Sequence, residues 1–188
     1  SNIMLIYGAA GTGKTTLIKY ISNMFGDARK LYITKTHTAL QNVIRNLGKN
    51  FDNCDFEIID SITRSNSAVV HDIVFIDECS NIDNRTMELL LGKISNDALI
   101  VMSGDVYQIE SIDFGNWFFY AKDIVKAKGG SIELCSTWRT KKEELKGLWK
   151  AVREKSTIIT EMLSMDGPFS ENLGENIFHL DEDEVVLC

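Results

Sequence analysis

The feature that most constrains this chain is a glycine-rich stretch, GAAGTGKT, which spans residues 8–15 and follows the apolar run IMLIY. It fits the pattern GxxxxGK[ST], in which small residues let backbone N–H groups close around an anion. Such a loop works between a strand and a helix, because the helix N-terminus adds a favourable dipole. Residues 17–25 have helical spacing of apolar side chains. The sequence therefore predicts a strand, a phosphate-binding loop and a helix in succession.

Short apolar runs alternate with amphipathic helical patterns along most of the chain. The runs are β-branched and nearly continuously apolar, which is typical of parallel strands covered on both faces. The expected strands are residues 3–8, 30–35, 56–60, 73–78, 98–104 and 132–137. Four helical stripes are expected to face the core: Leu17, Ile18, Ile21, Met24 and Phe25; Leu40, Val43, Ile44 and Leu47; Met87, Leu90, Leu91 and Ile94; and Leu145, Leu148, Trp149 and Val152. With right-handed crossovers, the alternation predicts an α/β fold with a three-layer, doubly wound, mostly parallel sheet.

Composition favours a protein with one hydrophobic core and without a membrane helix, a zinc site or a disulfide framework. The 188 residues are 44% hydrophobic, enough for one substantial core. No apolar run approaches the roughly 20 residues of a membrane helix, so no membrane partner is expected. The four cysteines lack metal-ligand or disulfide spacing, which favours a cytoplasmic location. The net charge of −7 is unevenly distributed, with basic residues concentrated in 1–50 and 121–160, so two basic blocks can attract phosphate although the whole chain is acidic.

The chain is expected to contain one main domain, residues 1–155. Residues 156–188 hold the only proline, in MDGPFSENLGEN, and end on the apolar-acidic sequence DEDEVVLC. We interpret this part as a loop and a first strand that lead into a further domain. The chemistry is therefore expected in residues 1–155.

The glycine-rich loop is the predicted nucleotide site, with ATP and Mg²⁺ as the expected ligands. Lys14 can reach the β- and γ-phosphates, and the Thr15 hydroxyl can ligate Mg²⁺. The complete set of expected nucleotide-binding residues is Gly8, Ala9, Ala10, Gly11, Thr12, Gly13, Lys14, Thr15 and Thr16.

Two acidic residues end the predicted strand 73–78. Asp77 is placed to hold Mg²⁺ through its water shell, and Glu78 is a candidate general base that orients the attacking water. A buried acid at a strand end is otherwise costly unless a cation lies nearby. Glu78 favours water as the phosphate acceptor over a small-molecule substrate, and the sequence has no NKxD motif for guanine.

The next strand ends in MSGDVYQIES, where Gln108 brings a polar amide towards the same edge of the sheet. The amide can bond both the γ-phosphate and the attacking water, and so sense whether the γ-phosphate is present. The glycine-rich loop, the Asp77–Glu78 pair and GDVYQ follow one another in the order found in superfamily 1 helicases and translocases. The chain resembles their first RecA-like motor domain in particular. The stretch GDVYQIESIDFG is similar to the RecD-like branch of that superfamily.

The resemblance covers roughly residues 3–140. The corresponding motifs are GAAGTGKTT (I), ITKTHTAL (Ia), IIDSIT (Ib), IDECS (II), GDVYQ (III) and LCSTWRT (IV). It implies an ATP hydrolase in which Arg139 completes the γ-phosphate site, although an arginine just past a strand is more often a surface residue. It also implies a second RecA-like domain elsewhere in a full-length chain. Without that domain, nucleotide binding and turnover are expected to be weak.

The resemblance also implies a single-stranded DNA or RNA partner. The expected contacts with the nucleic-acid backbone are Thr36, His37 and Thr38 at a helix start, and Ser61, Thr63 and Arg64 in a second loop. Thr36 or Thr38 could equally cap the helix. Trp117, Phe118 and Phe119 could stack bases, but such a cluster is more often part of a core.

Two other classes of function remain open at this stage. One is an AAA+ remodelling ATPase, with Arg139 acting in trans and Ser103 as a sensor. That class requires a helical lid with its own arginine after residue 140, which the acidic tail does not offer. The other is a nucleotide-gated binding module, in which ATP only changes affinity.

Overall fold

The computed structural model describes residues 2–48, 53–106 and 117–136. Its centre is a six-stranded sheet in the order β3-β2-β4-β5-β1-β6, and each pairing is parallel. The strands are β1 (Ile3–Gly8), β2 (Lys30–Thr34), β3 (Cys54–Ile58), β4 (Ile73–Ile76), β5 (Leu99–Gly104) and β6 (Ser131–Leu134). The helices are α1 (Lys14–Met24), α2 (His37–Leu47), α3 (Ile59–Arg64), α4 (Asn84–Leu91) and α5 (Trp117–Ala127), with the short 3-10 helix η1 at Cys79–Asn81.

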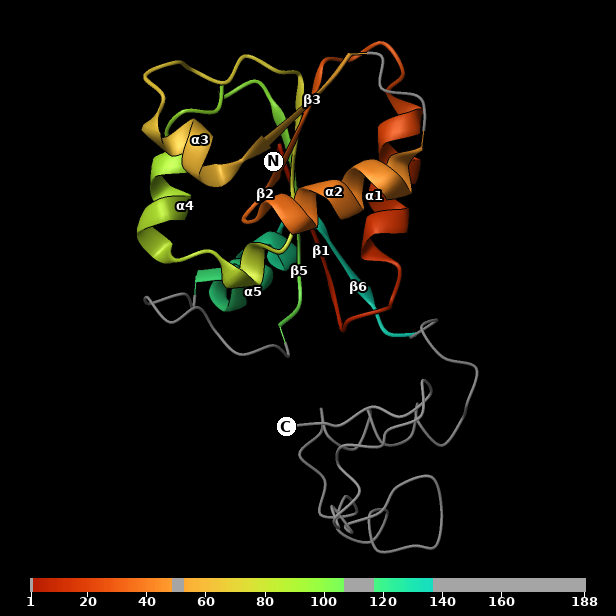
Figure 1. Ribbon diagram of the computed structural model, residues 1–188. Helices are drawn as coiled ribbons and strands as arrows, with labels where there is room; N and C mark the ends of the chain where they lie inside the picture. Colours follow the sequence, from red (N-terminus) through yellow and green to blue (C-terminus); the bar gives the residue numbers. More distant parts are fainter. Residues whose placement is uncertain (1, 49–52, 107–116, 137–188) are drawn as a thin grey trace, which may run out of the picture. The chain divides into compact units, whose positions relative to one another are not determined.

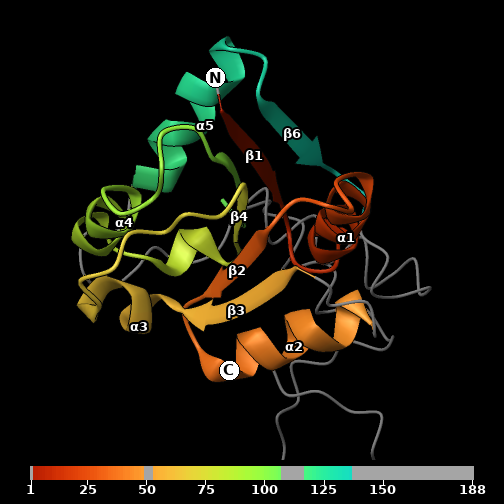
Figure 2. The ribbon, with the colours of Figure 1, turned by 90° about the horizontal axis from the view of Figure 1, so that it is seen from above.

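The helices cover both faces of the sheet, which gives three layers (Figure 1). One apolar cluster joins one face of the sheet to α1 and α2, and the other joins the opposite face to α3, α4 and α5. Seen from above, these two groups of helices lie on opposite sides of the strands (Figure 2). The predicted α/β class, with its doubly wound parallel sheet, is confirmed.

An aromatic stack crosses three strands on the α1–α2 face. The Tyr32 ring on β2 stacks on Phe56 of β3 at 5.2 Å and on Phe75 of β4 at 4.7 Å between centroids. The three residues share one rung of the sheet, because Tyr32 pairs with both Phe56 and Phe75. The Tyr32 hydroxyl donates a hydrogen bond to Ser22 of α1, and burial raises the pKa of Tyr32 to about 12. The stack therefore fixes β3, β2 and β4 side by side.

The position of the third strand differs from the prediction. It covers Cys54–Ile58 rather than 56–60, and the chain turns directly into α3 at Ile59. Ile59 and Ile62 are buried at a spacing of three residues, which is helical rather than extended. The apolar run at 56–60 thus contains the end of a strand and the start of a helix.

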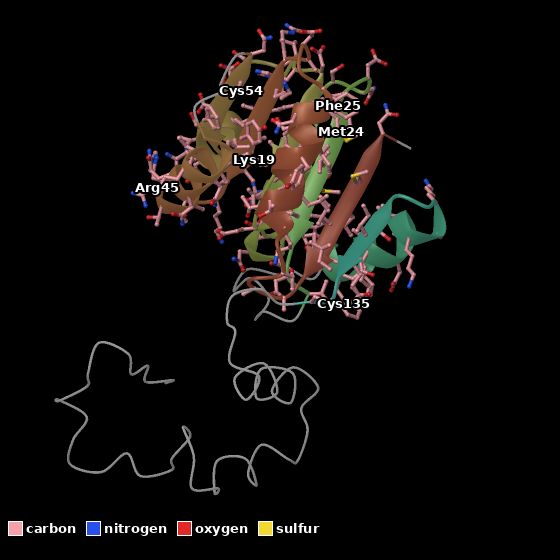
Figure 3. All side chains as sticks on the ribbon, turned by 90° about the vertical axis from the view of Figure 1, so that its right-hand side faces the viewer. Lys19, Met24, Phe25, Arg45, Cys54 and Cys135 are labelled. Atoms are coloured by element: carbon pink, nitrogen blue, oxygen red, sulfur yellow. The ribbon has the colours of Figure 1, made fainter. Side chains whose placement is uncertain are left out.

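The end of α1 also differs from the prediction. Ile18 and Ile21 are buried as expected, but Met24 is 79% exposed and Phe25 is 43% exposed. Figure 3 shows both residues at the end of α1. Met24 is the last residue of the helix and Phe25 lies beyond it. The apolar stripe in the sequence therefore extends further along the chain than the part of α1 that packs on the sheet.

Close packing at the end of β5 gives a stability prediction. A Cβ atom on Gly104 would lie 2.5 Å from Cζ of Phe118, which is only 2% exposed and cannot move aside easily. We expect Gly104→Ala to lower the free energy of unfolding by about 1–3 kcal/mol through overpacking. Urea unfolding measures this, with Gly26→Ala as the control, because nothing lies within 4 Å of a Cβ there. Equal midpoints for the two variants would contradict the packing described.

Candidate active site

The glycine-rich loop connects β1 to α1, as predicted. Gly13 has φ 93°, a left-handed conformation that favours glycine, and it directly precedes the first residue of α1. Gly8 is packed so closely that a Cβ atom would lie 2.4 Å from the carbonyl oxygen of Leu134 on β6. The two positions require glycine for different reasons, backbone conformation at one and space at the other.

Hydrogen bonds within the loop hold its shape. The buried Thr12 donates from Oγ1 to the carbonyl of Ala9 at 2.8 Å. Lys14 Nζ donates to the carbonyls of Gly8 and Ala9 at 2.8 and 2.9 Å. The Lys14 ammonium group therefore lies over the loop, and the first turn of α1 begins directly beside it. Backbone N–H groups in a first helical turn lack partners within the helix, which makes this a suitable place for an anion.

Asp77 follows the last residue of β4 and is half-buried. Its Oδ1 accepts hydrogen bonds from the Ser103 hydroxyl of β5 and from the Glu78 backbone N–H at 3.0 Å. The expected pairing of the strand before Asp77 with the strand 98–104 is confirmed, since β4 and β5 pair in parallel. The Ser103 contact was not predicted, although it could be inferred from the register: the last pair is Ile76 with Met102, and Asp77 and Ser103 come next.

Glu78 has an unusual backbone. Its φ of 56° and ψ of 35° are left-handed, which is uncommon for a residue other than glycine and marks a constrained position. Although the residue is exposed overall, partial burial of the carboxyl group raises the pKa of Glu78 above 4.5, and the Asp77 charge raises it further. The Lys14 ammonium opposes this rise. Lys14, Asp77 and Glu78 are thus close enough to interact electrostatically.

The ends of β4 and β5 are also connected through Ser80, which the sequence did not single out. The buried Ser80 accepts a hydrogen bond through Oγ from the backbone N–H of Asp105 at 3.3 Å. This bond joins the IDECS motif to the GDVYQ motif. Gln108 and Arg139, the other two predicted catalytic residues, lie outside the described residues.

The first predicted group of nucleic-acid contacts lies at the start of α2. Thr36 is the N-cap, and its Oγ1 accepts a hydrogen bond from the Ala39 N–H at 3.1 Å. Thr36, His37 and Thr38 are all exposed. The capping role is therefore observed for Thr36, and its exposure leaves a second role open.

The second predicted group does not lie in a loop. Ser61, Thr63 and Arg64 belong to α3. Thr63 Oγ1 donates to the Ile59 carbonyl at 3.0 Å, and Arg64 forms an exposed ion pair with Asp60 at 3.6 Å. The loop prediction was wrong because the strand ends two residues earlier than expected, which leaves room for a helical turn.

The aromatic cluster belongs mainly to the core. Phe118 is buried, and Trp117 is half-buried with its indole N–H donating to the Ile82 carbonyl at 2.8 Å. Phe119 is 49% exposed and has the Lys122 ammonium 4.6 Å from its ring centroid. Two of the three side chains are thus committed to packing, as the core interpretation expected.

This fold, with its phosphate loop between β1 and α1 and acidic residues after β4, defines a P-loop NTPase. The chain belongs to the AAA_30 family, described as an AAA domain, which matches residues 1–170. No curated protein sequence matches the chain.

Several solved structures are similar in fold. Bacteroides Pif1 bound to ssDNA has a TM-score of 0.60 at 17% identity, covering 87% of this chain and 45% of that one. The Pif1 helicase from Bacteroides in complex with ADP-AlF3 and ssDNA has a TM-score of 0.56 at 16% identity, with coverage of 87% and 44%. The Arterivirus nonstructural protein 10 helicase with DNA has a TM-score of 0.57 at 14% identity, with coverage of 81% and 40%.

The chain spans less than half the length of these structures. The resemblance to helicases that the sequence predicted is confirmed at the level of the fold, since these structures of similar fold are helicases. Within the described part of the chain, every helix is too short or too polar to cross a bilayer.

Proposed function

We propose that this chain is the first motor domain of an ATP-dependent helicase or translocase acting on single-stranded nucleic acid. The observation that carries the proposal is the arrangement at the carboxyl edge of the sheet. Lys14, Asp77 and Glu78 gather after β1 and β4, and the exposed start of α2 follows the neighbouring strand β2. Ligands of α/β sheets bind at this edge.

The residues present fit Mg²⁺-ATP. The loop offers backbone N–H groups and the Lys14 ammonium, and Asp77 offers a half-buried carboxylate whose Oδ1 is fixed by two donors. Lys14 would bind the β- and γ-phosphates, while Thr15 and Asp77 would hold the metal, which supplies neutralisation of phosphate charge. Glu78 would accept the proton of the attacking water. The roles of Gln108 and Arg139, in sensing and stabilising the γ-phosphate, rest on the sequence motifs.

A hydrogen bond connects the two halves of the proposed site. Lys35, directly before Thr36, donates from Nζ to the carbonyl of Asn81 in η1, three residues after Glu78. A displacement at the start of α2 would therefore act on the segment that carries Glu78, the proposed general base. This contact supports coupling between nucleic-acid binding and hydrolysis.

The full motor requires more than the described residues. We include in the proposal a second RecA-like domain in the full-length chain, into which residues 156–188 would lead, with residues 1–155 as the first domain. The cytoplasmic location that the cysteine pattern indicates belongs to the same proposal. The AAA+ remodelling alternative is not favoured, since the similar solved structures reported above are helicases.

The test is the ATPase rate with and without single-stranded DNA or RNA, measured on the full-length protein. Strong stimulation by a single strand supports the motor. Stimulation only by a protein partner would replace the motor with a remodelling ATPase. Nucleotide binding that alters nucleic-acid affinity without any turnover would replace it with a binding module.

The start of α2 gives a prediction that separates capping from nucleic-acid binding. Thr36→Ala should lower the free energy of unfolding by about 1 kcal/mol through loss of the cap, and also weaken binding of a labelled single strand. Thr38→Ala should weaken binding with little change in stability. Urea unfolding and fluorescence anisotropy at fixed salt provide the two measurements.

The control is Asp83→Ala. Asp83 caps α4 by accepting from the Thr86 N–H at 2.8 Å, so the variant should lose stability without losing affinity for the strand. Unchanged strand affinity in both threonine variants would remove α2 from the proposed interface.

A further inference from the structure

Ser103 is a polar residue in an otherwise apolar part of the sheet. It lies on β5 between β4 and β1, and its exposed fraction is 0%. Side chains on one rung of a parallel sheet share a face, and Ser103 pairs with Ile6, which belongs to the apolar cluster on the α1–α2 face. The Ser103 side chain therefore points to the same face as α1, the helix that the phosphate loop precedes.

A buried hydroxyl is costly unless it forms a hydrogen bond. The Ser103 hydroxyl donates to Oδ1 of Asp77, the same oxygen that accepts from the Glu78 N–H. One donor lies on β5 and the other is the backbone N–H of the residue that follows Asp77, so together they fix the rotation of the carboxylate rather than only its position. Among the described residues, the donors to Asp77 both act on Oδ1.

We propose that Ser103 is a positioning residue for Asp77: its hydroxyl fixes Oδ1, so that Asp77 would hold Mg²⁺ in one orientation of the carboxylate. The inference rests on the proposed function and deepens it, because it makes the Mg²⁺ dependence of nucleotide binding depend partly on a residue of β5. Ser103 acts only through Asp77. The hydroxyl should therefore matter for the effect of Mg²⁺ on nucleotide binding and little for nucleotide binding without metal.

The experiment is a Mg²⁺ titration of the binding of a fluorescent ATP analogue, followed by anisotropy and repeated in EDTA. We expect Ser103→Ala to raise the Mg²⁺ concentration at half-saturation by about tenfold, the ratio typical of losing a hydrogen bond to a charged group. Affinity in EDTA should not change. Ser103→Thr, which keeps the hydroxyl, should restore most of the Mg²⁺ dependence.

Two controls separate positioning from a general loss of structure. Ser22→Ala removes another buried serine hydroxyl, one bonded to Tyr32, and should lower stability without shifting the Mg²⁺ midpoint. In an Asp77→Ala background, Ser103→Ala should have no further effect on that midpoint. If Ser103→Ala does not fold, Ser103→Cys keeps the size with a weaker donor and should give an intermediate midpoint.

The outcomes distinguish this inference from the proposed function. If the unmodified chain binds the analogue equally with and without Mg²⁺, the proposed metal-nucleotide site itself is wrong. If the unmodified chain depends on Mg²⁺ but Ser103→Ala has the same midpoint, the site stands and the inference about Ser103 is overturned. An equal loss of affinity with Mg²⁺ and in EDTA would also overturn it, because that result indicates a structural role.

Discussion

Lys14→Ala is expected to abolish ATP turnover and to weaken nucleotide binding by at least about tenfold. The reason is that hydrogen bonds from a charged donor to phosphate contribute roughly 1.5–3 kcal/mol each. The variant also removes the bonds from Nζ to the Gly8 and Ala9 carbonyls, so the loop loses an internal connection. Steady-state hydrolysis and anisotropy of a fluorescent ATP analogue measure the two effects.

The matched control is Lys19→Ala. Lys19 lies on the same helix, and its Nζ donates to the Asn46 carbonyl in α2 at 3.1 Å, away from the loop (Figure 3). This variant should bind and hydrolyse ATP like the unmodified protein. An active Lys14→Ala variant would refute the assignment of residues 8–16 to the phosphates.

Glu78→Gln is expected to retain ATP binding while turnover falls by about 10²- to 10⁴-fold, the contribution typical of a general base. Glutamine has almost the same size and can occupy the same left-handed backbone, so the substitution removes the proton acceptor and little else. Single-turnover hydrolysis and analogue binding check the two parts. Glu88→Gln, at an exposed position on α4, is the control and should change neither. Loss of binding in Glu78→Gln would mean that Glu78 is structural.

The pH dependence provides a second measurement on Glu78. Partial burial and the Asp77 charge raise the pKa of Glu78 above 4.5. A general base works as the carboxylate, so turnover should fall as the pH decreases, with a midpoint above 4.5. Because the pKa of Glu78 is higher in the folded than in the unfolded state, the free energy of unfolding should decrease as the pH rises from the unfolded-state pKa through the folded-state pKa. In Glu78→Gln, the residual turnover should lack this acidic limb.

Much of the fold follows from the sequence because parallel strands buried on both faces need continuous apolar runs. The runs at 3–8, 73–78 and 98–104 identified β1, β4 and β5 and placed their polar ends at one edge. The prediction of a strand over 56–60 was wrong at its end, because apolar residues can also begin a buried helix. Only the contacts of Ile59 and Ile62 in the core distinguish a helix from a strand here.

The site could be predicted only where a residue type identifies its own chemistry. Lys14 and Asp77 lie in spacing patterns that are specific to phosphate and metal binding. The contacts of Ser103 on β5 and Ser80 in η1 have no such pattern, because they depend on which strand lies next to which. The left-handed backbone of Glu78 also has no signature in a non-glycine residue.

The stack of Tyr32 on Phe56 and Phe75 has a mechanical consequence. Sliding of β2 against β3 or β4 would separate aromatic rings that are in direct contact, so the stack opposes movement of these strands relative to one another. A displacement at the carboxyl end of β2 is therefore expected to move β3 and β4 with it. The displacement would also reach the segment after β4, because Lys35, which follows β2, donates a hydrogen bond to the carbonyl of Asn81.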